Sequence, residues 1–64
     1  MKIYIATLLA RSLADDKVWQ FIELASADKQ KVEDFLKNNK KTDILTVNND
    51  ECFVERGAIE VELQ

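Results

Sequence analysis

The first 25 residues contain two segments that are typical of β-strands and are hydrophobic on both faces. Residues 2–11 and 17–25 are rich in β-branched and aromatic side chains. The SLADD stretch between them has turn residues, so the two segments predict an antiparallel hairpin. Successive side chains of a strand point to opposite faces, and an antiparallel sheet normally exposes polar residues on its solvated face. Neither face of this hairpin is polar, so each face needs a cover.

Alternation divides the hairpin residues into two apolar sets. The first strand has Ile3, Ile5 and Leu9 on one face and Tyr4, Ala6, Leu8 and Ala10 on the other; the second has Trp19, Phe21 and Ala25 on one face and Val18, Ile22 and Leu24 on the other. If the carboxy-terminal segment folds over the sheet, both faces are sealed within one chain. If it does not, the exposed apolar face is an interface for self-association or for a partner.

Residues 27–38 predict one helix. Ser26 is the expected N-cap, and Asp28 stands in the first turn, where the helix dipole favours an acidic side chain. Val32, Phe35 and Leu36 recur at helical spacing and form a single apolar stripe. The pair Asn38–Asn39 is expected to end the helix in the left-handed conformation. A helix with three large apolar residues can cover only one face of the sheet.

The carboxy-terminal third predicts a short strand at 43–47, a turn at 48–50 and a terminal hairpin around Arg56–Gly57, which holds the only glycine of the chain. A helix over 50–64, capped by Asn49, is the alternative. The alternation of apolar and acidic residues over 59–63 favours strands. The expected fold is therefore α+β, a single domain over 1–64 with one helix and a small, mostly antiparallel sheet in the order β-β-α-β-(β-β).

A two-residue turn at 56–57 would gather most of the acidic side chains on one face. The outer face would then hold Glu51, Phe53, Glu55, Glu60 and Glu62, and the inner face Cys52, Val54, Ile59, Val61 and Leu63. One interpretation is that the glutamates give solubility and protect an edge strand from pairing. The other is that they form a docking patch for a basic partner, with Phe53 or Trp19 as an apolar anchor.

The residues that most enzymes need are scarce in this sequence. Histidine is absent, the one cysteine (Cys52) is expected to be buried, and there is no glycine-rich phosphate loop. The adjacent carboxylates are typical of solvated turns and helix surfaces, and the NNDE stretch at 48–51 lacks the spacing of a calcium loop. We therefore expect a non-enzymatic protein without a metal or cofactor.

The small size of the chain predicts extra support from a partner. A domain of 64 residues buries only about 60% of its unfolded surface, and a single cysteine excludes an internal disulfide. We therefore expect a homo-oligomer or a complex. One free cysteine and no signal peptide predict an intracellular, cytoplasmic protein, and the apolar run at 3–10 is too short to span a membrane.

Charge is distributed unevenly: residues 1–42 carry a net +2 and residues 43–64 a net −5. The first hypothesis is an oligomeric inhibitor that masks a basic partner protein. A protein that handles nucleic acid is one such partner. In general composition such a chain is similar to small phage-encoded (viral) inhibitors of host defence. The second is an oligomer that sequesters a nucleotide-like small molecule between subunits, with Arg11, Lys17, Trp19 and Phe21 as ligand-binding residues. The overall acidity argues against direct contact with nucleic acid.

Overall fold

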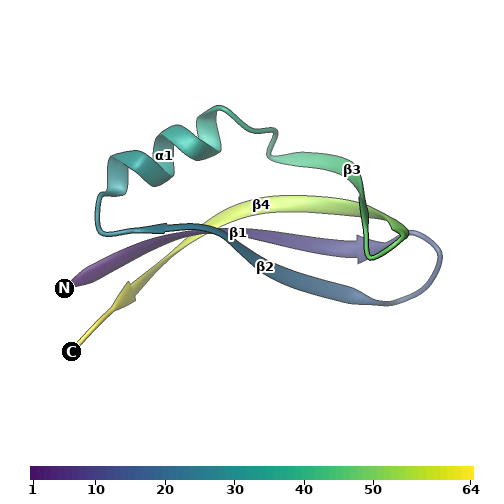
Figure 1. Ribbon diagram of the computed structural model, residues 1–64, viewed down its shortest axis with the longest axis horizontal. Helices are drawn as coiled ribbons and strands as arrows, with labels where there is room; N and C mark the ends of the chain where they lie inside the picture. Colours follow the sequence, from purple (N-terminus) through teal and green to yellow (C-terminus); the bar gives the residue numbers. More distant parts are fainter.

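The computed structural model describes residues 1–64 and contains one helix and a four-stranded sheet (Figure 1). The elements are β1 (Lys2–Ser12), β2 (Val18–Ser26), α1 (Lys29–Lys37), β3 (Thr42–Val47) and β4 (Asp50–Glu62). The sheet has the order β2-β1-β4-β3, and all neighbouring strands are antiparallel. The α+β class, the first hairpin and the single helix are therefore confirmed.

The predicted terminal hairpin is wrong, because β4 is one continuous strand. Its register with β1 runs without a break from Lys2 opposite Glu62 to Ser12 opposite Cys52. Gly57 lies opposite Thr7 within this ladder and does not have a positive φ. The long β1 offers a pairing partner at every position of β4 from Cys52 to Glu62, whereas a local hairpin would leave most of that edge of β1 unpaired.

The tight turn of this half of the chain lies earlier, where the sequence predicts a turn at 48–50. Asn48 and Asn49 have φ values of 51° and 68° and connect β3 to β4. Two successive positive φ values are typical of a type I′ hairpin turn, and asparagine tolerates this conformation better than most residues. The turn is what allows β3 to pair with the first half of β4.

The helix begins later than the sequence predicts. Asp28 is the N-cap, and its Oδ1 accepts a hydrogen bond from the Gln30 N–H at 3.0 Å. Ser26 ends β2, and its Oγ accepts from the Asp28 N–H at 3.0 Å. At the other end Asn38 is right-handed, not left-handed as expected. The Ser26 side chain, two residues before the N-cap, thus orders the capping residue instead of capping the helix itself.

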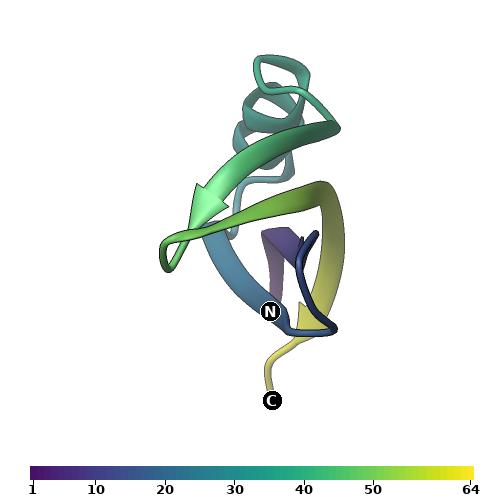
Figure 2. The ribbon, with the colours of Figure 1, turned by 90° about the vertical axis from the view of Figure 1, so that its right-hand side faces the viewer.

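The unbroken register assigns each residue of β4 to a face. Even-numbered residues of β1 and β4 share the face that we call inner, where Leu8, Ala10, Cys52 and Val54 are buried together and Trp19, Leu45 and Val47 pack against them. Helix α1 packs on one end of this face, with Val32 buried (Figures 1 and 2). Odd-numbered residues of β1 and β4 share the outer face, which no other element covers.

Candidate functional site

An exposed aromatic residue lies on the outer face of β4, between two glutamates. Phe53 is 45% exposed, and Glu51 and Glu55 flank it on the same side of the strand. In the register, Phe53 lies between Arg11 of β1 and Ile44 of β3. Neither glutamate takes part in a salt bridge, so both carboxylates are available to a binding partner.

The surface around Phe53 is shallowly hollowed. Leu9, Arg11, Phe53 and Glu55 line a depression of about 130 Å³, and Ile44 beside it is 54% exposed. We call this surface the Phe53 patch and define it as Leu9, Arg11, Ile44, Glu51, Phe53 and Glu55. It combines an aromatic side chain, two aliphatic side chains and two unpaired carboxylates with one guanidinium.

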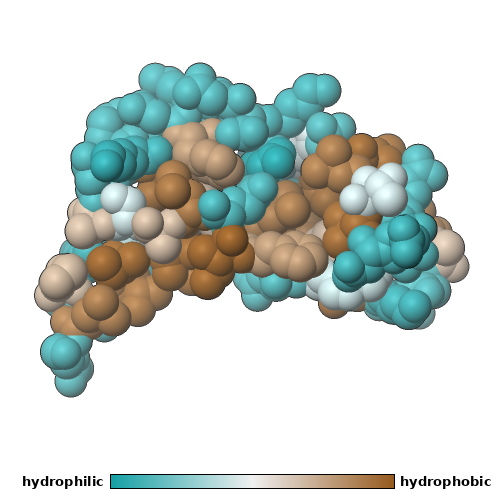
Figure 3. All heavy atoms as spheres, viewed as in Figure 1, coloured by the Kyte–Doolittle hydropathy of each residue, from teal (hydrophilic) through white to brown (hydrophobic).

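The rest of the outer face carries no charge at all. Beyond the Phe53 patch, toward the free ends of the chain, the register brings together Ile3, Ile5, Thr7, Ile22, Ala25, Gly57, Ile59 and Val61. We call this surface the uncharged half. Ile22 is 68% exposed and Ile59 is 50% exposed. Figure 3 shows hydrophobic residues along the sheet, whereas the side of α1 that points away from the sheet is hydrophilic.

The continuous β4 divides the predicted acidic site between the two faces. Glu51, Phe53 and Glu55 share the outer face as expected, but Glu60 and Glu62 lie on the inner side. The Glu60 carboxylate is 3.7 Å from Lys2 Nζ, and the Glu62 carboxylate is 3.6 Å from the amino-terminal nitrogen. Because no turn resets the alternation at 56–57, Ile59 and Val61 also lie opposite to the face predicted for them.

The four residues predicted to bind a small ligand do not converge. Trp19 is half-buried on the inner face against the core, and Phe21 lies opposite Leu8 on the same face. Arg11 belongs to the outer face, and Lys17 pairs with Asp15 in the turn before β2 at 3.7 Å. The two aromatic side chains and the Arg11 guanidinium therefore lie on opposite faces of the sheet. Trp19 also lies on the face opposite to the Phe53 patch.

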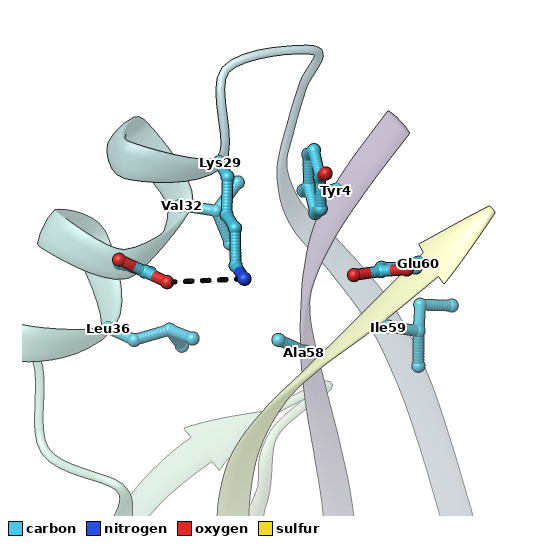
Figure 4. A pocket seen from close by; sticks show the side chains of 8 residues that line it. Tyr4, Lys29, Val32, Leu36, Ala58, Ile59 and Glu60 are labelled. Atoms are coloured by element: carbon cyan, nitrogen blue, oxygen red, sulfur yellow. Dashed lines mark ion pairs between the residues drawn. The ribbon is translucent and has the colours of Figure 1, made fainter. Parts of the chain in front are cut away.

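A cleft between α1 and the sheet was not predicted from the sequence. It has a volume of about 210 Å³ and an apolar floor of Tyr4, Val32, Leu36 and Ala58, with Lys29, Glu33 and Glu60 around it (Figure 4). Lys29 Nζ and the Glu33 carboxylate are 3.9 Å apart. The cleft exists because α1 packs mainly over β1 and β2 and leaves the last part of β4 uncovered. Only the strand order, which sequence patterns do not give, could have revealed it.

Arg56 was predicted to lie in a turn, but in the structure it is part of β4 and its side chain links distant segments. Its Nε donates to the Glu23 carboxylate at 2.9 Å and its Nη1 to the Lys40 carbonyl oxygen at 2.8 Å. Glu23 is the extra residue of a bulge in β2, between Ile22 opposite Thr7 and Leu24 opposite Ala6. The pair therefore ties β4 to β2 across β1 and holds the segment before β3. The sequence signal that could have indicated this ion pair is that Arg56 is the one basic residue in the acidic carboxy-terminal third of the chain.

The structure contains no cluster of metal-ligating side chains, and its one thiol is buried. No three carboxylates or thiols come together in a way that could hold a metal ion. The Cys52 thiol is fully buried in the core cluster, and its Sγ lies 3.5 Å from the Asp50 carbonyl oxygen. The one helix, α1, falls short of the length and hydropathy that a membrane-spanning helix requires.

Comparison with known proteins identifies no relative. The chain has no significant match among protein-family models, curated proteins or solved structures.

Proposed function

We propose that this protein is a non-enzymatic binding module that attaches to a basic surface of a partner protein and masks it. The observation that carries the proposal is the Phe53 patch, in which an exposed aromatic side chain lies between two unpaired carboxylates. Binding hot spots are enriched in aromatic anchors, and rim charges steer the approach of an oppositely charged partner. This combination suits an inhibitor of a basic protein, including one that handles nucleic acid.

The uncharged half supports self-association. Interfaces that are permanently buried are more apolar than transient ones and have few charges at their centre. The outer face meets this description between Ile5, Ile22 and Ile59, and it continues directly into the Phe53 patch. A second copy on the uncharged half would bury the apolar surface that one chain leaves exposed and would leave the glutamates of the Phe53 patch free for the partner.

One truncated variant and one charge-reversed double variant test the partner proposal. Partners recovered by affinity purification are reconstituted with purified protein, and the dissociation constant is measured at several salt concentrations. Phe53→Ala should weaken binding by about 2 kcal/mol, and Glu51→Lys with Glu55→Lys should slow association and lower its salt dependence. Asp16→Lys with Asp34→Lys is the matched charge control, because both residues are exposed, form no salt bridge and lie outside the Phe53 patch. Equal binding by all variants would refute the role of the Phe53 patch.

Native mass spectrometry tests the oligomer separately. We expect a symmetric oligomer that Ile22→Lys converts to monomer, since a lysine on the uncharged half would be buried without a partner. A monomer for the natural sequence would contradict this part of the proposal. An oligomer that retains a small-molecule mass would favour the sequestration hypothesis instead.

A further inference from the structure

One edge of β4 pairs with β1, and the other edge pairs with β3 over only part of its length. Backbone groups of odd-numbered residues point to β1, as the bond from the Leu63 N–H to the Met1 carbonyl oxygen at 2.7 Å shows. In an antiparallel sheet, successive residues direct their backbone groups to alternate edges. Even-numbered residues of β4 therefore point toward β3, and the Arg56 N–H donates to the Lys41 carbonyl oxygen at 2.7 Å on that side.

The edge beyond Arg56 has no partner strand. β3 is short, and its first residue, Thr42, lies opposite Glu55. No hydrogen bond of the structure occupies the N–H or carbonyl groups of Ala58, Glu60 and Glu62 on this edge. All three residues are exposed. The sheet thus ends in an open edge that is available to a further strand.

We propose that this edge binds an extended segment of a basic protein as a fifth strand, beside β4 and in line with β3. The proposal goes beyond the proposed function, because this edge is separate from the Phe53 patch and could bind without it. Addition of a strand to an exposed edge is a common mode of peptide recognition, with affinity from the backbone and specificity from alternate side chains.

The charge along the edge selects the partner. On the inner side, Glu60 and Glu62 would be the neighbours of alternate side chains of the added strand, and the cleft beside α1 opens next to Ala58 and Glu60. Its apolar floor suits the aliphatic stem of a lysine or arginine, whose charged end would reach the Glu60 carboxylate, whereas Glu33 already pairs with Lys29 inside the cleft. The present pairs of Glu60 and Glu62 are exposed, so exchange for a partner's cation costs little.

The outer side of the same edge requires apolar residues. Gly57, Ile59 and Val61 line it and belong to the uncharged half. Side chains of the added strand that point to this side would extend that apolar surface. The expected segment therefore alternates basic and apolar residues.

A second copy of this chain fits the edge poorly. The antiparallel register that uses all three free residues of both copies sets Ala58 opposite Glu62 and Glu60 opposite Glu60. Like charges directly opposite each other destabilise a strand pair. Registers that would bring Arg56 to the edge of the other copy are blocked, because its N–H already bonds to Lys41.

The test uses a short fluorescein-labelled peptide that alternates lysine and valine, with fluorescence anisotropy as the readout. A glutamate–valine peptide controls for charge, and a lysine–valine peptide with N-methylated alternate amides controls for backbone pairing. We expect saturable binding of the lysine–valine peptide only. Glu60→Lys with Glu62→Lys should weaken it about tenfold or more.

The backbone contribution is tested by Ala58→Pro, which removes a donor that faces the open edge and leaves every bond to β1 in place. It should also weaken binding about tenfold. If circular dichroism shows that this variant does not fold, the N-methylated peptide and the amide protection of Ala58, Glu60 and Glu62 in the complex decide the question.

Glu51→Lys with Glu55→Lys separates this proposal from the Phe53 patch and should leave peptide binding unchanged. The edge proposal is overturned if the lysine–valine peptide does not bind, if the N-methylated peptide binds equally well, or if only the Phe53-patch variant weakens binding. Concentration-dependent protection of the three edge amides without peptide would show that a second copy occupies the edge and would also overturn it.

Discussion

Replacement of Arg56 by methionine distinguishes a continuous β4 from a hairpin turn at the same residues. In a turn the side chain would be solvated and its loss nearly neutral. In the structure the Arg56 side chain is only 11% exposed and Glu23 only 21%, with Nε and the carboxylate 2.9 Å apart. Arg56→Met would leave a mostly buried carboxylate without its cation and the Lys40 carbonyl oxygen without its donor.

The expected cost follows from these contacts. Loss of one partner of a buried ion pair costs roughly 3–5 kcal/mol, and the partial access of water to Glu23 reduces this to about 2–3 kcal/mol. For a chain of this size, 1 kcal/mol corresponds to about 4–8 °C, so the melting temperature should fall by about 10–20 °C. Such a loss is a large fraction of the stability of a small domain.

Urea unfolding in a double-mutant cycle gives the measurement. Glu23→Met and Arg56→Met are compared with the double variant at one fixed protein concentration, since an oligomer's stability depends on concentration. The double variant should recover much of the loss, because two apolar side chains replace the pair without an uncompensated charge. A cost below about 0.5 kcal/mol for Arg56→Met, or strictly additive losses, would refute the structural role assigned to this pair.

Three further predictions concern local features of the fold. Asn49→Gly should raise the free energy of unfolding by about 0.5–1 kcal/mol and Asn49→Ala should lower it, because the residue has a φ of 68°; urea unfolding of both variants checks the opposite signs. Asp28→Ala should cost about 1 kcal/mol through loss of the N-cap bond, whereas Ser26→Ala should cost less, and thermal unfolding by circular dichroism compares the two. The Cys52 thiol should react with a disulfide reagent only as fast as the chain unfolds, so labelling that stays rapid in the folded state would contradict its burial.

The local elements could be predicted from the sequence because short-range physics specifies them. The turn residues between two β-rich segments are enough to predict β1 and β2, and the spacing of Val32, Phe35 and Leu36 is enough to predict α1. The exposed set of Glu51, Phe53 and Glu55 also follows from alternation alone, whichever way the strand continues. For the double-sided apolar hairpin the sequence left two outcomes open, a second face sealed by the carboxy-terminal segment or an exposed one, and the structure has the exposed one.

Only the tertiary structure decided that Arg56 and Gly57 lie in a continuous strand and not in a turn. Local preference favours a turn around a lone glycine, but pairing with the long β1 satisfies the backbone groups of the whole segment and keeps it extended. Since side chains alternate along a strand, this one outcome fixes the face of every later residue and moves Glu60 and Glu62 away from Phe53. The strand order, the buried Arg56–Glu23 pair and the open edge beside Ala58 depend on contacts between residues far apart in the sequence, which local patterns do not specify.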